Sequence, residues 1–195
     1  MAIQNEIERL GGIESLEDQF RPLNEAEIGK IEQEVNGQIP DDYRWLLTTY
    51  GAFIFTNSVK FEPIKQKPEY VHAEELGMPS GIFCGSGVAT IYGKGGKNGS
   101  ADLLKKIRTF EERMPNAFLP FADDGLGNQL CLALDKAHYQ NVYWWDHELE
   151  FDAEDYEEET GEVMPEAAKY QNVYLVASNL TEFFEKLKVA ASDDA

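Results

Sequence analysis

The spacing of the apolar residues changes near residue 53, and this change limits the folds that the chain can adopt. Before that point, Ile28, Ile31 and Val35 recur at the spacing of one helix face. After it, short apolar runs such as 129–134 are separated by turn residues, a pattern typical of strands. Helices, then strands, then a closing helix predict a single α+β domain over residues 1–195, with a mainly antiparallel sheet flanked by helices.

Polar residues mark where the helices are expected to begin. Asn24 can cap the first of the longer helices, and Glu27, three residues on, completes a capping box with it. The caps expected for the later helices are Asp41, Ser100 and either Ser178 or Asn179.

The expected strands are 53–55, 59–61, 82–84, 88–92, 118–122, 129–134, 142–147 and 173–176. Residues 129–134 are apolar on both faces, which predicts a central strand. Because side chains alternate along a strand, Trp144 and Trp145 are expected on opposite faces of the sheet. At least one of them is expected in the core. The other can lie at a surface rim, where aromatic residues are favoured in interfaces, and Trp144 is the candidate.

The net charge of the chain restricts its partners. The sequence has 36 acidic residues against 17 Lys and Arg, a formal net charge of −19. A field of this sign repels nucleic acid and anionic membrane surfaces, and it attracts basic proteins. The alternative is that the charge serves solubility alone, and composition does not separate these two interpretations.

The acidic residues are concentrated in one segment. No Lys or Arg lies between Lys136 and Lys169, and residues 146–166 contain eleven Asp and Glu. Like charges at this density repel one another, which predicts an extended or mobile acidic surface loop at about 146–168. The residues expected to contact a partner are Asp123, Asp124, Trp144, Glu154, Asp155, Glu157, Glu158 and Glu159.

Motifs for catalysis or metal binding are missing from the sequence. The three histidines and two cysteines have no ligand-like spacing, and no Gly-x-Ser-x-Gly nucleophile motif occurs. The glycine-rich stretch 93–100 lacks a Lys directly before Ser100, so it is not a phosphate-binding P-loop. We therefore expect no catalytic residue, no metal and no cofactor.

The sequence also suggests a cellular location. The N-terminus has no basic region followed by an apolar run, and no stretch approaches the roughly 20 apolar residues of a membrane helix. Cys84 and Cys131 lie in apolar surroundings, which favours buried thiols in a reducing compartment. These features predict a cytoplasmic protein that is not bound to membranes.

Four segments in succession resemble one known family. They are Leu23 to Gly51 with Ile39-Pro40-Asp41-Asp42-Tyr43 at its centre, Phe121 to Cys131 with the turn Asp123-Asp124-Gly125-Leu126-Gly127-Asn128, Val142 to Glu148, and Ser178 to Phe184. Together they resemble the SUKH superfamily, which includes yeast cell-wall synthesis regulators and many bacterial immunity proteins. The family often has two glycines after the second helix, whereas Ala52 follows Gly51 here.

The resemblance implies an α+β fold without catalytic residues. In bacterial members it also implies binding and inhibition of a toxin domain, commonly a nuclease, in competition between bacteria. Nuclease toxins are usually basic because they must bind phosphates, so an acidic inhibitor would meet them quickly. The sequence therefore predicts an immunity protein whose partner is a toxin domain with a basic surface. The alternative is a non-enzymatic regulatory scaffold in a cell-wall or signalling pathway, as in the fungal relatives, which tend to carry long disordered extensions.

Overall fold

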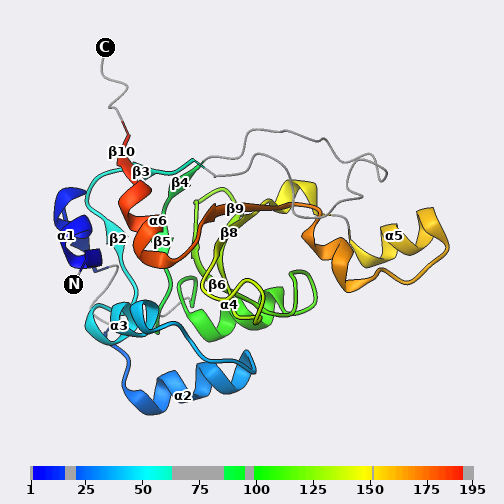
Figure 1. Cartoon of the computed structure of the whole chain (residues 1–195), viewed down its shortest axis with the longest axis horizontal. Helices are drawn as coiled ribbons and strands as arrows, with labels where there is room; N and C mark the ends of the chain where they lie inside the picture. The colour runs from blue at the N-terminus through cyan, green and yellow to red at the C-terminus, as the bar shows by residue number, and fades with distance from the viewer. Residues whose placement is uncertain (1, 16–20, 63–85, 95–98, 151, 191–195) are drawn as a thin grey trace.

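An antiparallel sheet runs through the centre of the computed structural model (Figure 1), which describes residues 2–15, 21–62, 86–94, 99–150 and 152–190. Its strands are, in spatial order, β5 (Thr90–Ile91), β6 (Phe118–Asp123), β7 (Gln129–Ala133), β8 (Val142–Trp145) and β9 (Val173–Ala177). The predicted α+β class with antiparallel pairing is confirmed. That residues 1–195 form one domain stays a prediction.

The strand at the middle of this sheet is β7, as its apolar sequence predicted. It pairs with β6 on one side and β8 on the other, and every one of its residues is buried. In β8, Val142 and Trp144 face the larger hydrophobic core, whereas Tyr143 and Trp145 face a smaller cluster on the other side of the sheet. The predicted alternation of the two tryptophans is therefore confirmed.

Helices α1 (Ala2–Arg9), α3 (Asp41–Thr49) and α6 (Leu180–Lys186) contribute to the larger core. The ring of Phe121 in β6 lies 5.8 Å from the ring of Tyr43 in α3 and 5.6 Å from that of Phe183 in α6. These edge-on aromatic contacts join α3 and α6 to the sheet. Burial of such large rings is a main favourable term in the free energy of folding.

Short strands extend the fold beyond the central sheet. β1 (Ile13–Glu14) pairs with β2 (Ile54–Phe55), and β3 (Val59–Lys60) pairs with both β4 (Gly87–Val88) and β10 (Lys188–Val189). The predicted strand 88–92 is thus divided, because Val88 pairs with β3 whereas Thr90 and Ile91 pair with β6. The predicted strand 82–84, with Cys84, lies outside the described residues.

The ends of the helices test the predicted caps. At α2 (Glu25–Glu34) the capping box of Asn24 and Glu27 is present, with Asn24 Oδ1 accepting from the Glu27 amide at 3.0 Å. At α6 the cap is Asn179. The prediction that Asp41 caps α3 is wrong, because Pro40 occupies the N-cap position and Asp41 is the first residue of the helix.

The prediction that Ser100 caps the third helix is wrong. The cap of α4 (Leu103–Phe110) is Asp102, whose Oδ1 accepts from the Lys105 amide at 3.0 Å. The reason lies in Gly93, whose amide donates to Ala101 O and whose carbonyl accepts from the Leu103 amide. This pairing holds residues 101–103 alongside Gly93, so the helix begins two residues later than predicted.

Candidate functional site: the acidic helix

The prediction of an extended or mobile acidic loop is wrong for the centre of that segment. Residues Ala153–Thr160 form helix α5, between the 3-10 turns η1 (His147–Leu149) and η2 (Glu166–Tyr170). Asp152 Oδ1 caps α5 by accepting from the amides of Glu154 at 2.7 Å and Asp155 at 3.2 Å. Gly161 ends the helix in the left-handed region with φ 73°. These caps stabilise a helix that charge density alone argues against.

One aromatic side chain attaches α5 to the rest of the protein. Tyr156 is 8% exposed, whereas every other residue of α5 is exposed. The helix lies at one end of the molecule, away from α1 and α6 (Figure 1). A short helix held by a single buried ring presents most of its circumference to solvent.

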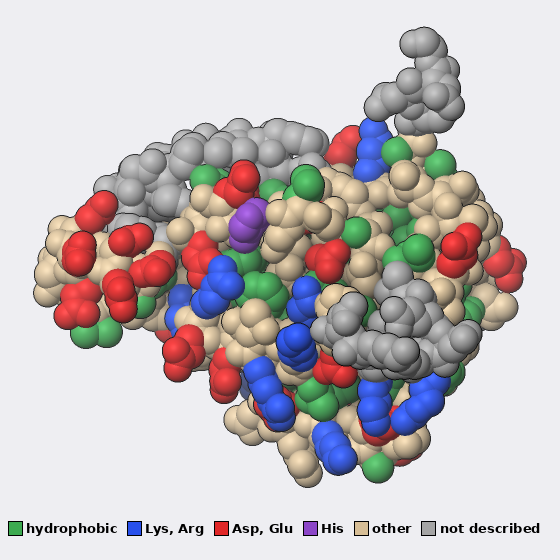
Figure 2. Space-filling model, turned by 180° about the vertical axis from the view of Figure 1, so that it is seen from behind, with side chains coloured by type: hydrophobic (Ala, Val, Ile, Leu, Met, Phe, Trp, Pro, Cys, Tyr) green, Lys and Arg blue, Asp and Glu red, His purple; other side chains and the backbone are tan. Residues whose placement is uncertain are grey.

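Five predicted partner-contact residues lie on this helix. They are Glu154, Asp155, Glu157, Glu158 and Glu159, and all five are exposed. None of their carboxylates forms an ion pair with a residue that the structure describes. Acidic side chains gather at this end of the molecule in Figure 2, whereas most Lys and Arg side chains on that face lie elsewhere. The arrangement is a concentrated negative surface.

The acidic residues of α5 favour the helix at its N-terminal end but not at its C-terminal end. Glu154 and Asp155 stand in the first turn, where acidic residues interact well with the helix dipole. Glu157, Glu158 and Glu159 stand toward the negative end, and the last turn has no basic residue. Because these three glutamates gain nothing from the helix dipole, their concentration there is unexplained by folding.

A groove of about 730 Å³ lies beside the N-terminal half of α5. Its lining residues are Glu112, Arg113, His147, Glu150, Asp152, Ala153, Glu154, Asp155, Met164 and Lys169. Arg113 Nε donates to Glu150 Oε1 at 2.9 Å, and Nη2 donates to Glu150 Oε2. This hydrogen bonding raises the pKa of Arg113, so the guanidinium stays charged. Sequence reasoning missed the groove because Arg113 and Glu150 are 37 residues apart in regions without a shared motif.

The carboxylates of Asp123 and Asp124 form hydrogen bonds within the protein. Asp124 is 9% exposed, and its Oδ2 accepts from Ser86 Oγ at 2.9 Å and from Asn128 Nδ2 at 2.6 Å. Asp123 Oδ2 lies 2.7 Å from Tyr92 Oη, and its Oδ1 accepts from the Gly125 amide. Both carboxylates thus hold the β6–β7 turn in place, and their contact with a partner stays a prediction.

Trp144 is not an exposed aromatic anchor. It is 5% exposed, and its ring lies 5.8 Å from that of Tyr174 in β9. Trp145, on the other face, is fully buried. The strand period places the two rings on opposite faces, and helices and turns then cover both faces.

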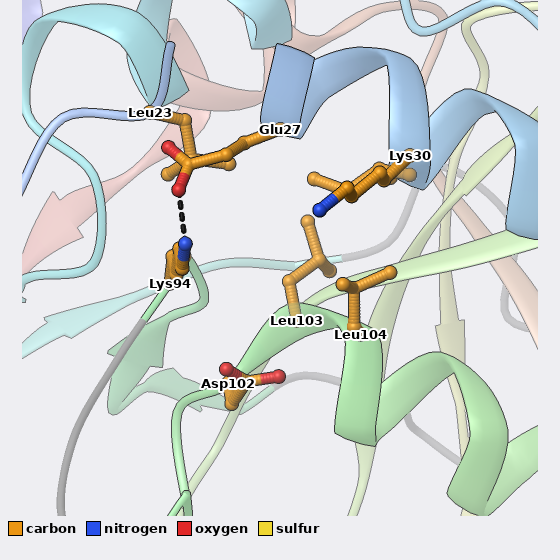
Figure 3. Close-up of a pocket in the computed structure, with 9 residues that line it drawn as sticks. Leu23, Glu27, Lys30, Lys94, Asp102, Leu103 and Leu104 are labelled. Carbon is orange, nitrogen blue, oxygen red and sulfur yellow. Dashed lines mark hydrogen bonds and ion pairs between the residues drawn. The ribbon is translucent and has the colours of Figure 1, made fainter.

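A smaller pocket of about 90 Å³ lies between α2 and α4 (Figure 3). Glu27 points across its mouth and forms an ion pair with Lys94, while Leu103 and Leu104 line it from α4. Hydrogen bonds from Arg21 and Lys94 hold the pKa of Glu27 well below its usual range. This ion-pair cluster joins α2 to the start of the glycine-rich stretch, of which residues 95–98 lie outside the described part.

Within the described residues, no three His, Cys, Asp or Glu side chains are grouped so that they could hold a metal ion. No helix in the same part of the chain is long and apolar enough to cross a membrane.

Comparison with known proteins establishes the family. The model of the SMI1/KNR4 family (SUKH-1) matches residues 22–186, so this chain belongs to that family, as its four motifs indicated. The chain is also similar to the SPbeta prophage-derived uncharacterized protein YokK of Bacillus subtilis (strain 168), at 24% identity over 139 residues. That match covers 67% of this chain and 65% of the length of YokK.

Proposed function

We propose that this protein is an immunity protein that binds and neutralises a toxin domain with a basic surface, and that α5 is the main contact. The observation that carries the proposal is the set of exposed carboxylates on α5 without ion-pair partners among the described residues. Family membership supports it, because bacterial SUKH proteins commonly bind toxins.

The physical basis of the proposal is electrostatic attraction between unlike surfaces. A nuclease-type toxin needs basic residues to hold phosphates, so its active face carries positive charge. A negative helix at one end of a protein with net charge −19 attracts that face before contact and raises the association rate. Occupation of the basic face would then block access of nucleic acid.

The test is protection from a toxin domain, sought first among the genes that neighbour this one. Co-expression with the intact protein should restore growth of a host that produces the toxin domain. The variant E157Q/E158Q/E159Q should protect less well. The matched control is E14Q/E62Q/E185Q, because it removes three charges from exposed acids outside α5. Equal protection by the two triple variants would contradict the role of α5, and no protection by the intact protein would contradict the function itself.

A further inference from the structure

We infer that the groove beside α5 receives an arginine-bearing segment of the partner protein, while the glutamates outside the groove act only at longer range. This inference rests on the proposed function and names the part of the site that makes direct contact. It divides the acidic helix into two surfaces. The inner surface is Glu154 and Asp155, and the outer surface is Glu157, Glu158 and Glu159.

The division follows from which side chains line the groove. Glu154 and Asp155 lie in its wall, whereas Glu157, Glu158 and Glu159 do not. A cation in the groove would therefore be close to the inner carboxylates and to the other residues of the lining. A cation beside the outer carboxylates would have no groove wall around it, and such exposed charge pairs contribute little to affinity.

The charges within the groove are unbalanced. Arg113 is paired with Glu150, and Lys169 is paired with Glu166 at 3.1 Å. Beyond these pairs the lining holds the acids Glu112, Asp152, Glu154 and Asp155, and no other Lys or Arg among the described residues. Asp152 is occupied as the cap of α5. The lining thus has an excess of negative charge, which a positively charged segment would neutralise.

The setting of Arg113 shows why arginine suits this groove. Its guanidinium carbon lies 5.2 Å from the ring centre of Phe110 and 5.4 Å from that of Trp145, and its nitrogens bind both oxygens of Glu150. A planar guanidinium can pair with a carboxylate through two hydrogen bonds, which the point charge of lysine cannot match. Ala153 and Met164 add apolar surface along which an arginine stem can lie.

The experiment uses the full chain and a short oligoarginine peptide as the probe, followed by methyl NMR. Met164 lines the groove, whereas Met114 is 2% exposed in the core and serves as the internal reference. The peptide should shift the Met164 methyl resonance in a saturable way and leave that of Met114 unchanged. An oligolysine peptide of equal length should bind more weakly, and an oligoglutamate peptide should not bind.

Two variants with equal charge change separate the two surfaces. E154Q/D155N should weaken the Met164 response about tenfold, through loss of charge-assisted hydrogen bonds. E158Q/E159Q should change it much less. Equal effects of the two variants, or peptide binding that leaves Met164 unshifted, would overturn the inference. Protection in the growth assay would be unaffected by that outcome, so a failure here is distinct from failure of the proposed function.

Discussion

The imidazole of His147 lies directly against Gly127. A β-carbon at position 127 would stand 2.8 Å from Cε1 and 2.9 Å from Nε2 of that ring, and Gly127 has φ 110°. His147 also lines the groove, and its amide donates to Asn128 Oδ1 at 3.0 Å. The β6–β7 turn therefore supports the residue that leads from the sheet into the acidic segment.

Gly127→Ala should lower the free energy of unfolding by about 1–3 kcal/mol, because it combines backbone strain with a collision at the His147 ring. Urea denaturation measures the loss. Gly161→Ala is the matched control, since Gly161 has φ 73° but no atom within 4 Å of an added β-carbon. Equal losses in the two variants would show that contact with His147 contributes nothing.

The variant E157Q/E158Q/E159Q should retain its stability within about 0.5 kcal/mol or gain slightly, because the three carboxylates are exposed and stand toward the negative end of α5. Thermal unfolding checks this. Asp152→Ala should instead cost about 1 kcal/mol through loss of the cap. A large drop in melting temperature for the triple variant would mean that its carboxylates are structural.

The association rate with the toxin domain proposed as partner should fall steeply with added salt, while the dissociation rate changes little. The screening length shrinks from ~10 Å at 0.1 M salt to ~3 Å at 1 M, which removes the attraction between separated surfaces. Surface-bound kinetics across a salt series measure both rates. At low salt, E157Q/E158Q/E159Q should also lower the association rate, and E14Q/E62Q/E185Q should lower it less. An association rate indifferent to salt would leave the acidic helix with solubility as its role.

Glu182 should contribute stability that acid removes. Hydrogen bonds from Ser178 and Lys186 lower the pKa of its carboxyl to about 2 in the folded protein, below the roughly 4.3 of an unfolded chain. The contribution of Glu182 to stability is complete at a pH above the pKa of the unfolded chain. It is lost as the pH falls through the pKa of the folded protein. Glu182→Gln should therefore have a lower melting temperature than the wild type at pH 7, and the difference should narrow toward pH 2. A constant difference would contradict this linkage.

The sequence predicted those elements that depend on residues close together in the chain. The capping box at Asn24 and Glu27 lies within one turn, and the apolar run of β7 shows that both of its faces are covered. The start of α4 could not be predicted, because it depends on pairing between Gly93 and Ala101, which only the folded chain brings together.

The sequence predicted the exposure of some candidate site residues and not of others. Glu154 and Glu157 are exposed as expected. The helix that carries them was not predicted. Repulsion among the acids disfavours a helix, and the cap at Asp152 and the burial of Tyr156, which stabilise it, are visible only in the structure. The burial of Asp124 does not follow from charge counting. Its Oδ2 accepts from Ser86 and Asn128, and its Oδ1 accepts from the Leu126 amide.

Because α5 is attached through Tyr156, the residues that maintain the fold are distinct from the residues that form the exposed surface of this helix. Substitutions on the solvent side of the helix alter charge and shape without disturbing a residue of the buried core. The residues that hold the helix are Tyr156, which is buried, and the caps Asp152 and Gly161, and none of them is among the five exposed acidic residues predicted to contact a partner. Under the proposed function, the choice of partner can therefore change through substitutions confined to one exposed helix, without any change in the buried core.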